Sequence, residues 1–240
     1  MKVLNLSYHP LNVRSGGWVD LSRKGNHGTP YGGVRPFQVC PGVMGYNFNG
    51  SGYVDCGSDE SLNILANQDF TLAVWIKFSQ SLSSAIVMGK YCDKATAGDW
   101  FGIFSNKISN RLSIGDGGEA FTSTSSTYND GFWHYSVYVA DRSGYGKIYV
   151  DAVLKASVDI SSMNGNLGLL RKVGGRFIDT YAFDGLIALP VIEKGRAWSE
   201  AEVRENMYRS PIYRMLRGLP HSWIYTKVPW KQTQGGIYVP

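Results

Sequence analysis

A stretch of alternating side chains constrains the fold of this chain more than any other feature. From Phe70 to Phe78 every second residue is apolar, and the intervening positions include Thr71 and Lys77. A period of two places successive side chains on opposite faces of an extended strand. Trp75 lies on the second face, which is therefore partly apolar as well. The pattern predicts a strand within two sheets packed face to face.

Shorter segments of strand character follow at even spacing, separated by clusters of Gly, Asn, Asp and Ser that favour turns. The predicted strands are 85–90, 100–105, 111–115, 133–140, 147–150 and 186–191. The 29 glycines and the 13% of aromatic residues suit an all-β protein with many turns. Because no segment of helical period separates these strands, a sandwich or jelly roll is favoured over a parallel α/β sheet.

One helix is signalled near the C-terminus. Ser199 is a suitable N-cap, and Glu202, three residues later, is its capping-box partner. Trp198 and Val203 occupy the two positions of a hydrophobic staple around that cap. The sequence therefore predicts a helix over residues 200–208 that ends before Pro211.

The positive charge lies at the C-terminal end. Lys and Arg number 24 and Asp and Glu 19, yet residues 206–240 hold five basic residues and no acidic one. We therefore expect a neutral body, residues 1–208, followed by an extended, basic and aromatic arm, residues 209–240. The arm residues expected to contact a partner are Arg209, Tyr213, Arg214, Arg217, Trp223, Tyr225 and Trp230.

Several partners could suit such an arm. Basic charge with interleaved aromatic residues is typical of single-strand nucleic-acid binding, but five charges are few and no nucleic-acid-binding fold accompanies them. Docking on another subunit or on a second copy of the chain is preferred, with packing back on the body as the competitor. No segment approaches the roughly 20 apolar residues of a membrane span, and no signal-peptide core is recognised, so no membrane partner is expected.

Ordered sequence segments indicate a family. They are 20–29, 46–54, 70–76, 133–135, 148–151 and 183–187, followed by the helix capped by Ser199. Over residues 15–208 the chain resembles the laminin-G-like domain of the concanavalin A-like lectin/glucanase superfamily. The resemblance implies a two-sheet antiparallel jelly roll. Ala152 stands where the family usually has glycine, so it is expected to take a turn conformation that glycine tolerates better.

The C-terminal helix and the aromatic, basic end also resemble laminin-G-like proteins of bacteriophage virions. This implies a non-enzymatic surface or decoration protein of the virion, assembled in the host cytoplasm and displaying its loops to glycans. The alternatives are a free carbohydrate-binding lectin module and a divergent polysaccharide-active enzyme.

The family resemblance implies a calcium site, because carboxylates and carbonyls of tight turns supply the oxygen ligands of a hard cation. The candidate ligands are Asp20, Asn26 and Asp184, with backbone carbonyls near Gly50 and Gly52. The alternative is that Asp20 and Asn26 cap a turn and Asp184 begins a strand. Asn49 stands where the family usually has aspartate, which weakens one carboxylate ligand.

The sequence carries no recognisable catalytic motif. Glucanases of the superfamily carry the pattern E-x-D-x-x-E, which does not occur here, and no nucleophile elbow or zinc-protease motif is found. His134 alternates with Trp133 and Tyr135 and is interpreted as a sheet histidine with satisfied hydrogen bonds rather than a base. Cys40, Cys56 and Cys92 form no C-x-x-C pair and are predicted to be free thiols. A non-enzymatic protein is therefore expected.

A sugar site needs aromatic rings beside polar side chains, because the C–H faces of a pyranose stack on aromatic planes. Four aromatic residues lie in polar, loop-like neighbourhoods: Trp100, Phe121, Tyr128 and Tyr181. They are the predicted glycan contacts, with ordinary packing as the alternative for each, while Trp75 and Trp133 are assigned to structure.

Overall fold

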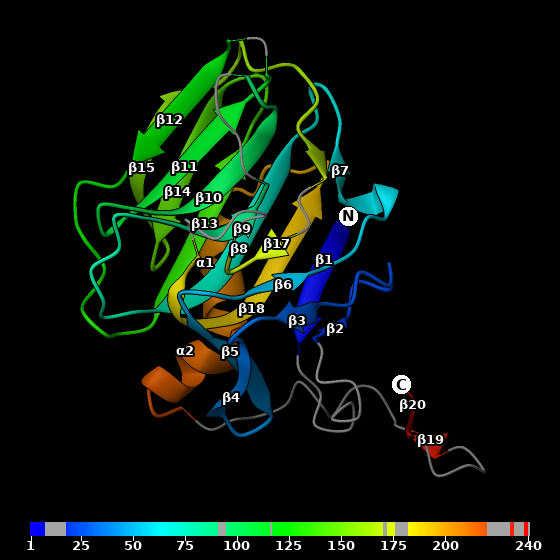
Figure 1. Ribbon diagram of the computed structural model, residues 1–240, viewed down its shortest axis with the longest axis vertical. Coiled ribbons are helices and arrows are strands. Elements are labelled where there is room, and N and C mark those ends of the chain that lie inside the picture. Colours follow the sequence, from blue (N-terminus) through cyan, green and yellow to red (C-terminus); the bar gives the residue numbers. More distant parts are fainter. Residues whose placement is uncertain are drawn as a thin grey trace.

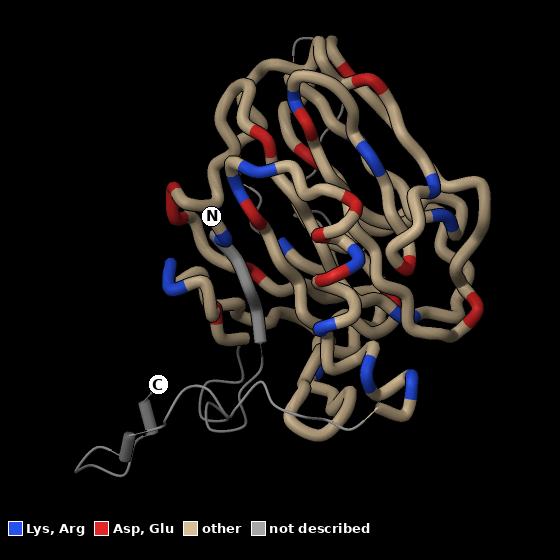
Figure 2. Tube along the Cα trace, turned by 180° about the vertical axis from the view of Figure 1, so that it is seen from behind, with Lys and Arg blue, Asp and Glu red and all other residues tan. Residues whose placement is uncertain are grey.

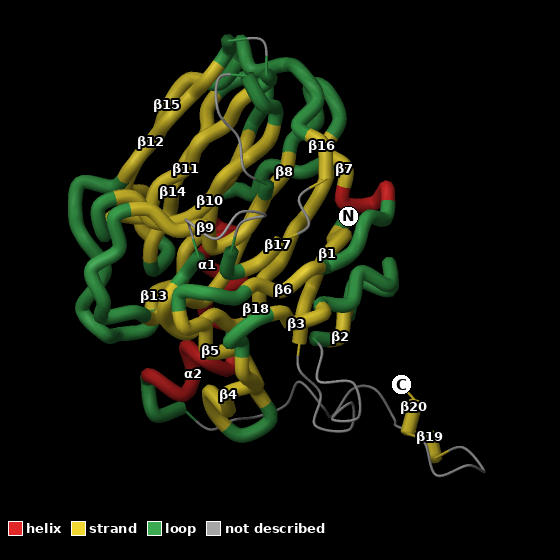
Figure 3. The backbone as a smooth tube through the Cα atoms, in the orientation of Figure 1, coloured by secondary structure: helices red, strands yellow, loops and turns green. Residues whose placement is uncertain are grey.

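Two antiparallel sheets packed face to face form the body of the protein (Figure 1). The computed structural model describes residues 1–7, 18–90, 95–115, 117–169, 172–175, 182–219, 231–232 and 238–239. In this part of the chain strands make up most of the body, and helix is limited to three short segments (Figure 3). The prediction of an all-β, two-sheet antiparallel sandwich is confirmed.

The larger sheet has nine strands in the order β15-β14-β13-β8-β18-β1-β2, with β5 pairing with β18 and β4 with β5. Its strands are β1 Lys2–Ser7, β2 Val19–Asp20, β4 Arg35–Cys40, β5 Val43–Asn49, β8 Phe70–Lys77, β13 His134–Ala140, β14 Tyr145–Val150, β15 Val153–Asp159 and β18 Asp184–Lys194. Strands far apart in the sequence are therefore neighbours, as expected of a jelly roll.

The smaller sheet has seven strands in the order β12-β11-β10-β9-β17-β6-β3. Its strands are β3 Thr29–Tyr31, β6 Tyr53–Asp55, β9 Ser84–Gly89, β10 Gly98–Phe104, β11 Lys107–Ser113, β12 Glu119–Ser123 and β17 Lys172–Val173. Two further pairs are β7 Asn63–Ile64 with β16 Gly168–Leu169, and β19 Lys231–Gln232 with β20 Tyr238–Val239. A short 3-10 helix spans Glu60–Leu62. All seven strands predicted from the sequence overlap observed ones.

Strand β8 is buried on both faces, as its alternation predicts. Phe70, Leu72 and Val74 face the smaller sheet and belong to the main core. Ala73 and Trp75 point the other way and belong to a second hydrophobic cluster. This second face is covered by helices rather than by the other sheet. Cys40 and Cys56 are buried, free thiols as predicted, whereas Cys92 lies outside the described residues.

Helices α1, Glu200–Arg209, and α2, Pro211–Leu216, cover the outer face of the larger sheet. Helix α1 begins as predicted, because Ser199 and Glu202 form the capping box. Val203 and Ile212 are fully buried in the second hydrophobic cluster. Their burial holds the helices on the sheet, since each such side chain contributes roughly 1.5–3 kcal/mol. None of the described helices is long and apolar enough to cross a bilayer.

The expectation of an extended arm beginning at residue 209 is wrong over its first residues. Arg209 ends α1, Tyr213 and Arg214 lie within α2, and Arg217 is the residue that caps α2. The physical reason is the dipeptide Ser210-Pro211, because serine is a strong N-cap and proline suits the first helical turn. The other arm residues, Trp223, Tyr225 and Trp230, lie outside the described residues.

Candidate ligand-binding cleft

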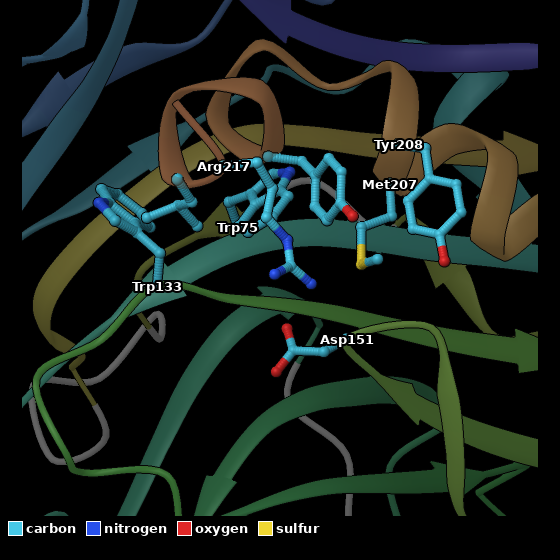
Figure 4. A pocket seen from close by; sticks show the side chains of 8 residues that line it. Trp75, Trp133, Asp151, Met207, Tyr208 and Arg217 are labelled. Atoms are coloured by element: carbon cyan, nitrogen blue, oxygen red, sulfur yellow. The ribbon is translucent and has the colours of Figure 1, made fainter. Parts of the chain in front are cut away.

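A cleft with a volume of about 420 Å³ opens between the two helices and the outer face of the larger sheet (Figure 4). This volume is within the range of small-molecule sites. Its lining residues come from β8, the start of β13, the β14–β15 turn, α1 and α2, and are Trp75, Trp133, Asp151, Met207, Tyr208, Tyr213, Leu216 and Arg217.

The floor of the cleft is aromatic. Trp75 on β8 lies directly opposite Tyr135 on β13, and their ring centroids are 5.2 Å apart. The period of two places both side chains on the outer face of the sheet, below the helices. The indole Nε1 of Trp75 is buried and has no hydrogen-bond partner among the described residues.

The helical wall of the cleft combines aromatic rings with one cation. Tyr208 and Tyr213 lie on either side of the break between α1 and α2, with ring centroids 4.9 Å apart. The guanidinium of Arg217 lies 5.5 Å from the ring centroid of Tyr213, the residue four positions earlier. Helix α2 contains Arg214 and is followed by its cap Arg217, and it has no acidic residue (Figure 2). This wall is therefore electropositive.

A tight turn places Asp151, the carboxylate found among the described residues that line the cleft. Asp151 and Ala152 have φ values of 52° and 62° between the paired residues Val150 and Val153, the geometry of a two-residue type I′ hairpin. Ala152 thus takes the conformation expected from its departure from the family glycine. The backbone N–H of Tyr135 donates to Asp151 Oδ1 at 2.9 Å, so the carboxylate is fixed.

His134 supports Asp151 from behind. Its Nδ1 lies 2.8 Å from Asp151 Oδ2, and its Nε2 lies 3.1 Å from both carboxylate oxygens of Asp130. Burial alone would lower the pKa of His134, but the hydrogen bonds and charges of Asp151 and Asp130 outweigh burial and raise it. The interpretation of His134 as a satisfied sheet histidine is confirmed. The ring of Tyr128 packs edge-on against it at 5.0 Å.

Asp151 and Arg217 face one another across the cleft. Figure 4 shows the carboxylate and the guanidinium pointing into the same space from opposite sides. No ion pair joins them in the described part of the chain. The open cleft therefore presents a hydrogen-bond acceptor and a fork of donors, between aromatic rings, to whatever enters it.

The aromatic residues predicted to contact a glycan do not line this cleft. Trp100 on β10 and Phe121 on β12 share a row with Arg111 of β11, across the outer face of the smaller sheet. Trp100 is only 6% exposed and Phe121 is 38% exposed. Tyr128 is buried beside His134, and Tyr181 lies outside the described residues.

The cleft residues that sequence reasoning missed as ligand contacts are Trp75, Trp133, Asp151, Met207, Tyr208 and Leu216. Tyr213 and Arg217 were predicted to contact a partner, but as residues of the extended arm rather than of a ligand-binding cleft. The one available signal was the combination of Tyr208, Tyr213 and Arg217 around the helix start at Ser210-Pro211.

The predicted calcium ligands do not form an evident metal cluster. The carboxylate of Asp20 accepts hydrogen bonds from the N–H and O–H of Ser22 and from the N–H of Asn26. The side-chain amide of Asn26 donates to Ser61, and Asp184 is the first residue of β18. Within the described ranges no group of three or more His, Cys, Asp or Glu could hold a metal ion. Calcium binding stays a prediction.

Solved structures with a similar fold include binding domains of clostridial toxins. The binding domain of Paraclostridial Mosquitocidal Protein 1 is 17% identical, with a TM-score of 0.63 over 85% of this chain and 51% of that one. The botulinum neurotoxin serotype G binding domain is 17% identical, with a TM-score of 0.65 over 86% and 50%. The chain thus spans about half the length of these domains.

A third structure shows a ligand. The botulinum neurotoxin serotype D ligand-binding domain, in complex with N-acetylneuraminic acid, is 16% identical, with a TM-score of 0.63 over 85% of this chain and 50% of that one. At these identities the likeness establishes the fold. A search of curated proteins found no match.

Residues 48–204, well over half of the chain, match the laminin-G-like family model described as the concanavalin A-like lectin/glucanases superfamily. They run from the end of β5 into the first half of α1 and so include strands of both sheets of the sandwich. The chain therefore belongs to the concanavalin A-like lectin/glucanase superfamily.

Proposed function

We propose that this protein is a non-enzymatic, lectin-like module that binds a glycan in the cleft between α2 and the larger sheet. The observation that carries the proposal is the meeting of Trp133 and Tyr213 with Asp151 and Arg217 in one cleft. The C–H faces of a sugar ring stack on aromatic planes, while a carboxylate and a guanidinium take its hydroxyl groups. Tyr208, 48% exposed, widens the stacking surface at the rim.

A binding role fits the chemistry of the cleft better than hydrolysis. Glycoside hydrolases usually need two carboxyl groups on opposite sides of the scissile bond. Among the described residues that line the cleft, Asp151 is the only one with a carboxyl group. Hydrogen bonds from the N–H of Tyr135 and from His134 hold this carboxylate in place and leave it lone pairs to accept from a sugar hydroxyl, but the cleft lining supplies no second carboxyl group for hydrolysis. This supports a protein that holds a sugar without cleaving it.

The structural neighbours support the same class of ligand. One neighbour is a complex with N-acetylneuraminic acid, and another is botulinum neurotoxin DC in complex with SialylT. A further one is the neurotoxin DC binding domain in complex with rat synaptotagmin II, so a protein receptor is the second class of partner. The cleft favours the glycan, because it is small, concave and lined by both rings and charges.

The setting that we propose for this module is the surface of a bacteriophage virion. Its support is the resemblance of the C-terminal end to virion proteins and the basic charge of α2, which suits contact with a neighbouring subunit. Mass spectrometry of purified particles from the source would find the chain if the proposal holds. Particles without it would refute the virion setting and leave glycan binding untouched.

Glycan binding is tested with the purified full chain on an array of neutral and acidic glycans, followed by calorimetry with the glycans retained. Tyr213→Ala is expected to weaken binding about tenfold, because it removes a stacking ring worth about 1.4 kcal/mol. Phe132→Ala is the matched control: Phe132 is 70% exposed and adjoins Trp133 but does not line the cleft. Phe121→Ala tests the other sheet. If Tyr213→Ala and both control variants bind the glycan equally well, the proposal that the cleft is the binding site is refuted.

A further inference from the structure

The surroundings of His134 favour its protonated state. A neutral imidazole carries one N–H and one lone pair, so it can donate to only one partner. Here both ring nitrogens lie within hydrogen-bond distance of carboxylate oxygens, Nδ1 of Asp151 and Nε2 of Asp130. A neutral ring would direct its lone pair at one of these carboxylates. This geometry therefore favours the imidazolium, which donates from both nitrogens.

Across the cleft, Arg217 has no carboxylate partner among the residues that the structure describes. The arginines of α1 pair with glutamates one turn away, Arg204 with Glu200 at 2.7 Å and Arg209 with Glu205 at 2.5 Å. Arg217 forms no ion pair within the described residues, and its side chain lies against the ring of Tyr213. Arg217 is the exposed residue that caps α2, so its long side chain can reorient without disturbing the core.

We propose that His134 is a positioning residue of this site: as an imidazolium it pairs with Asp151 and weakens the attraction of Asp151 for Arg217, and once deprotonated it lets Arg217 cross the cleft to Asp151 and obstruct the glycan. The proposal rests on the function proposed above. Asp151 itself keeps its place in both states, because the N–H of Tyr135 still holds its Oδ1. The moving part is therefore Arg217.

The two carboxylates that face His134 favour its protonated state. Asp130 reaches it from the loop before β13 and Asp151 from the β14–β15 turn. Tyr128 contributes a ring edge, and the residue opposite His134 on β8 is Ile76, which carries no charge. The two aspartates raise the pKa of His134 above its ordinary value of 6.5. The change from open to obstructed cleft should thus occur above that pH.

The first test repeats the glycan array at about pH 5.5 and about pH 9, on either side of a raised histidine midpoint. Binding should be about fivefold weaker at the higher pH, the size expected of an exposed ion pair that competes with the ligand. Asp130→Asn removes one carboxylate and should move the midpoint to lower pH. Asp159→Asn, at an exposed turn where Ser161 donates to the carboxylate, is the matched control and should leave it unchanged.

His134→Gln should make binding independent of pH over this interval, since no titrating group is left behind Asp151. Binding of the unaltered protein that is equal at both pH values, or a midpoint unmoved by Asp130→Asn, would overturn the proposal. By linkage, a saturating glycan should also raise the His134 midpoint by about 0.7 pH, the logarithm of the fivefold preference.

A second measurement needs no ligand and separates the two proposals. Nuclear magnetic resonance can follow the His134 ring and the Nε–H of Arg217 through the same pH titration. Both signals should move with one midpoint, because the charge change at His134 recruits Arg217. An Arg217 signal that stays constant through the His134 midpoint would overturn the proposal even if glycans bind. An array without any bound glycan would refute the proposed function, and the Arg217 signal would still decide the role of His134.

Discussion

Asp99 should make the stability of the protein fall as the pH rises. This residue of β10 is fully buried, and its two carboxylate oxygens accept hydrogen bonds from the side-chain amide of Asn110 at 3.1 and 3.0 Å. Burial raises the pKa of Asp99 to about 7, although the Asn110 hydrogen bond and the charge of Arg142 act to lower it. The carboxyl group is therefore protonated in the folded protein over a range in which it is ionised in the unfolded chain.

The sign and size of the effect follow from linkage. Between the unfolded pKa of 3.8 and the folded pKa of about 7, the native state binds more protons than the unfolded state. Stability is thus greatest below this interval and declines through it. The difference between the two pKa values corresponds to about 4 kcal/mol, at 1.36 kcal/mol for each unit. This is a large part of the 5–15 kcal/mol that separates a typical native state from its unfolded chain.

Asp99→Asn is the matching perturbation, because asparagine has the same shape and carries no charge. Urea unfolding from about pH 4 to about pH 9 should show a declining free energy of unfolding for the unaltered protein and a flatter curve for the variant. At the highest pH the variant should be more stable by up to about 4 kcal/mol, less the lost attraction to Arg142. Asp159→Asn, a fully solvated aspartate, should retain the decline. A variant with the same pH dependence as the unaltered protein would refute the reasoning.

Two further substitutions test packing at other sites. Ile212→Ala should cost about 2–4 kcal/mol in urea unfolding and weaken glycan binding, because fully buried Ile212 fixes α2 on the sheet; unchanged stability would contradict this anchor. Gly174→Ala should prevent the native packing, since Gly174 has a φ of 80° and an added Cβ would lie 1.9 Å from the ring of Phe48. A soluble variant with native near-ultraviolet circular dichroism would show that Phe48 can move aside.

Local sequence patterns were sufficient to predict the strands and helix α1, but not to predict the cleft. The alternation around Trp75 correctly predicted a strand with two buried faces, yet it could not say that helices rather than a sheet cover the second face. The capping box at Ser199 identified α1 because it lies within four residues. Asp151 reaches the cleft through a hairpin turn. Its partners His134 and Tyr135 lie on β13, and they are brought to the cleft because β13 pairs with both β8 and β14. Such pairing of distant segments cannot be inferred from a local sequence pattern.

The residues predicted to contact a glycan do not come together in one site, for a related reason. The polar sequence around Trp100 suggested an exposed loop, whereas β10 is an inner strand and leaves this side chain 6% exposed. The C-terminal prolines suggested an extended arm, and this interpretation overlooked the helix start at Ser210-Pro211. Burial of Ile212 then holds α2 against the sheet. A local sequence pattern does not show whether an apolar side chain will be buried by distant parts of the chain.

Ser210 has an energetic consequence for recognition. Its backbone N–H bonds to Met207 at the end of α1, and its side chain accepts from the N–H of Ile212 at the start of α2. Ser210 thus caps the end of α1 and the start of α2 with no linker between the helices. The angle between α1 and α2, called the elbow here, is therefore set before any ligand binds. A rigid elbow spares an incoming sugar the entropic cost of ordering a loop, which favours rapid capture with little backbone rearrangement.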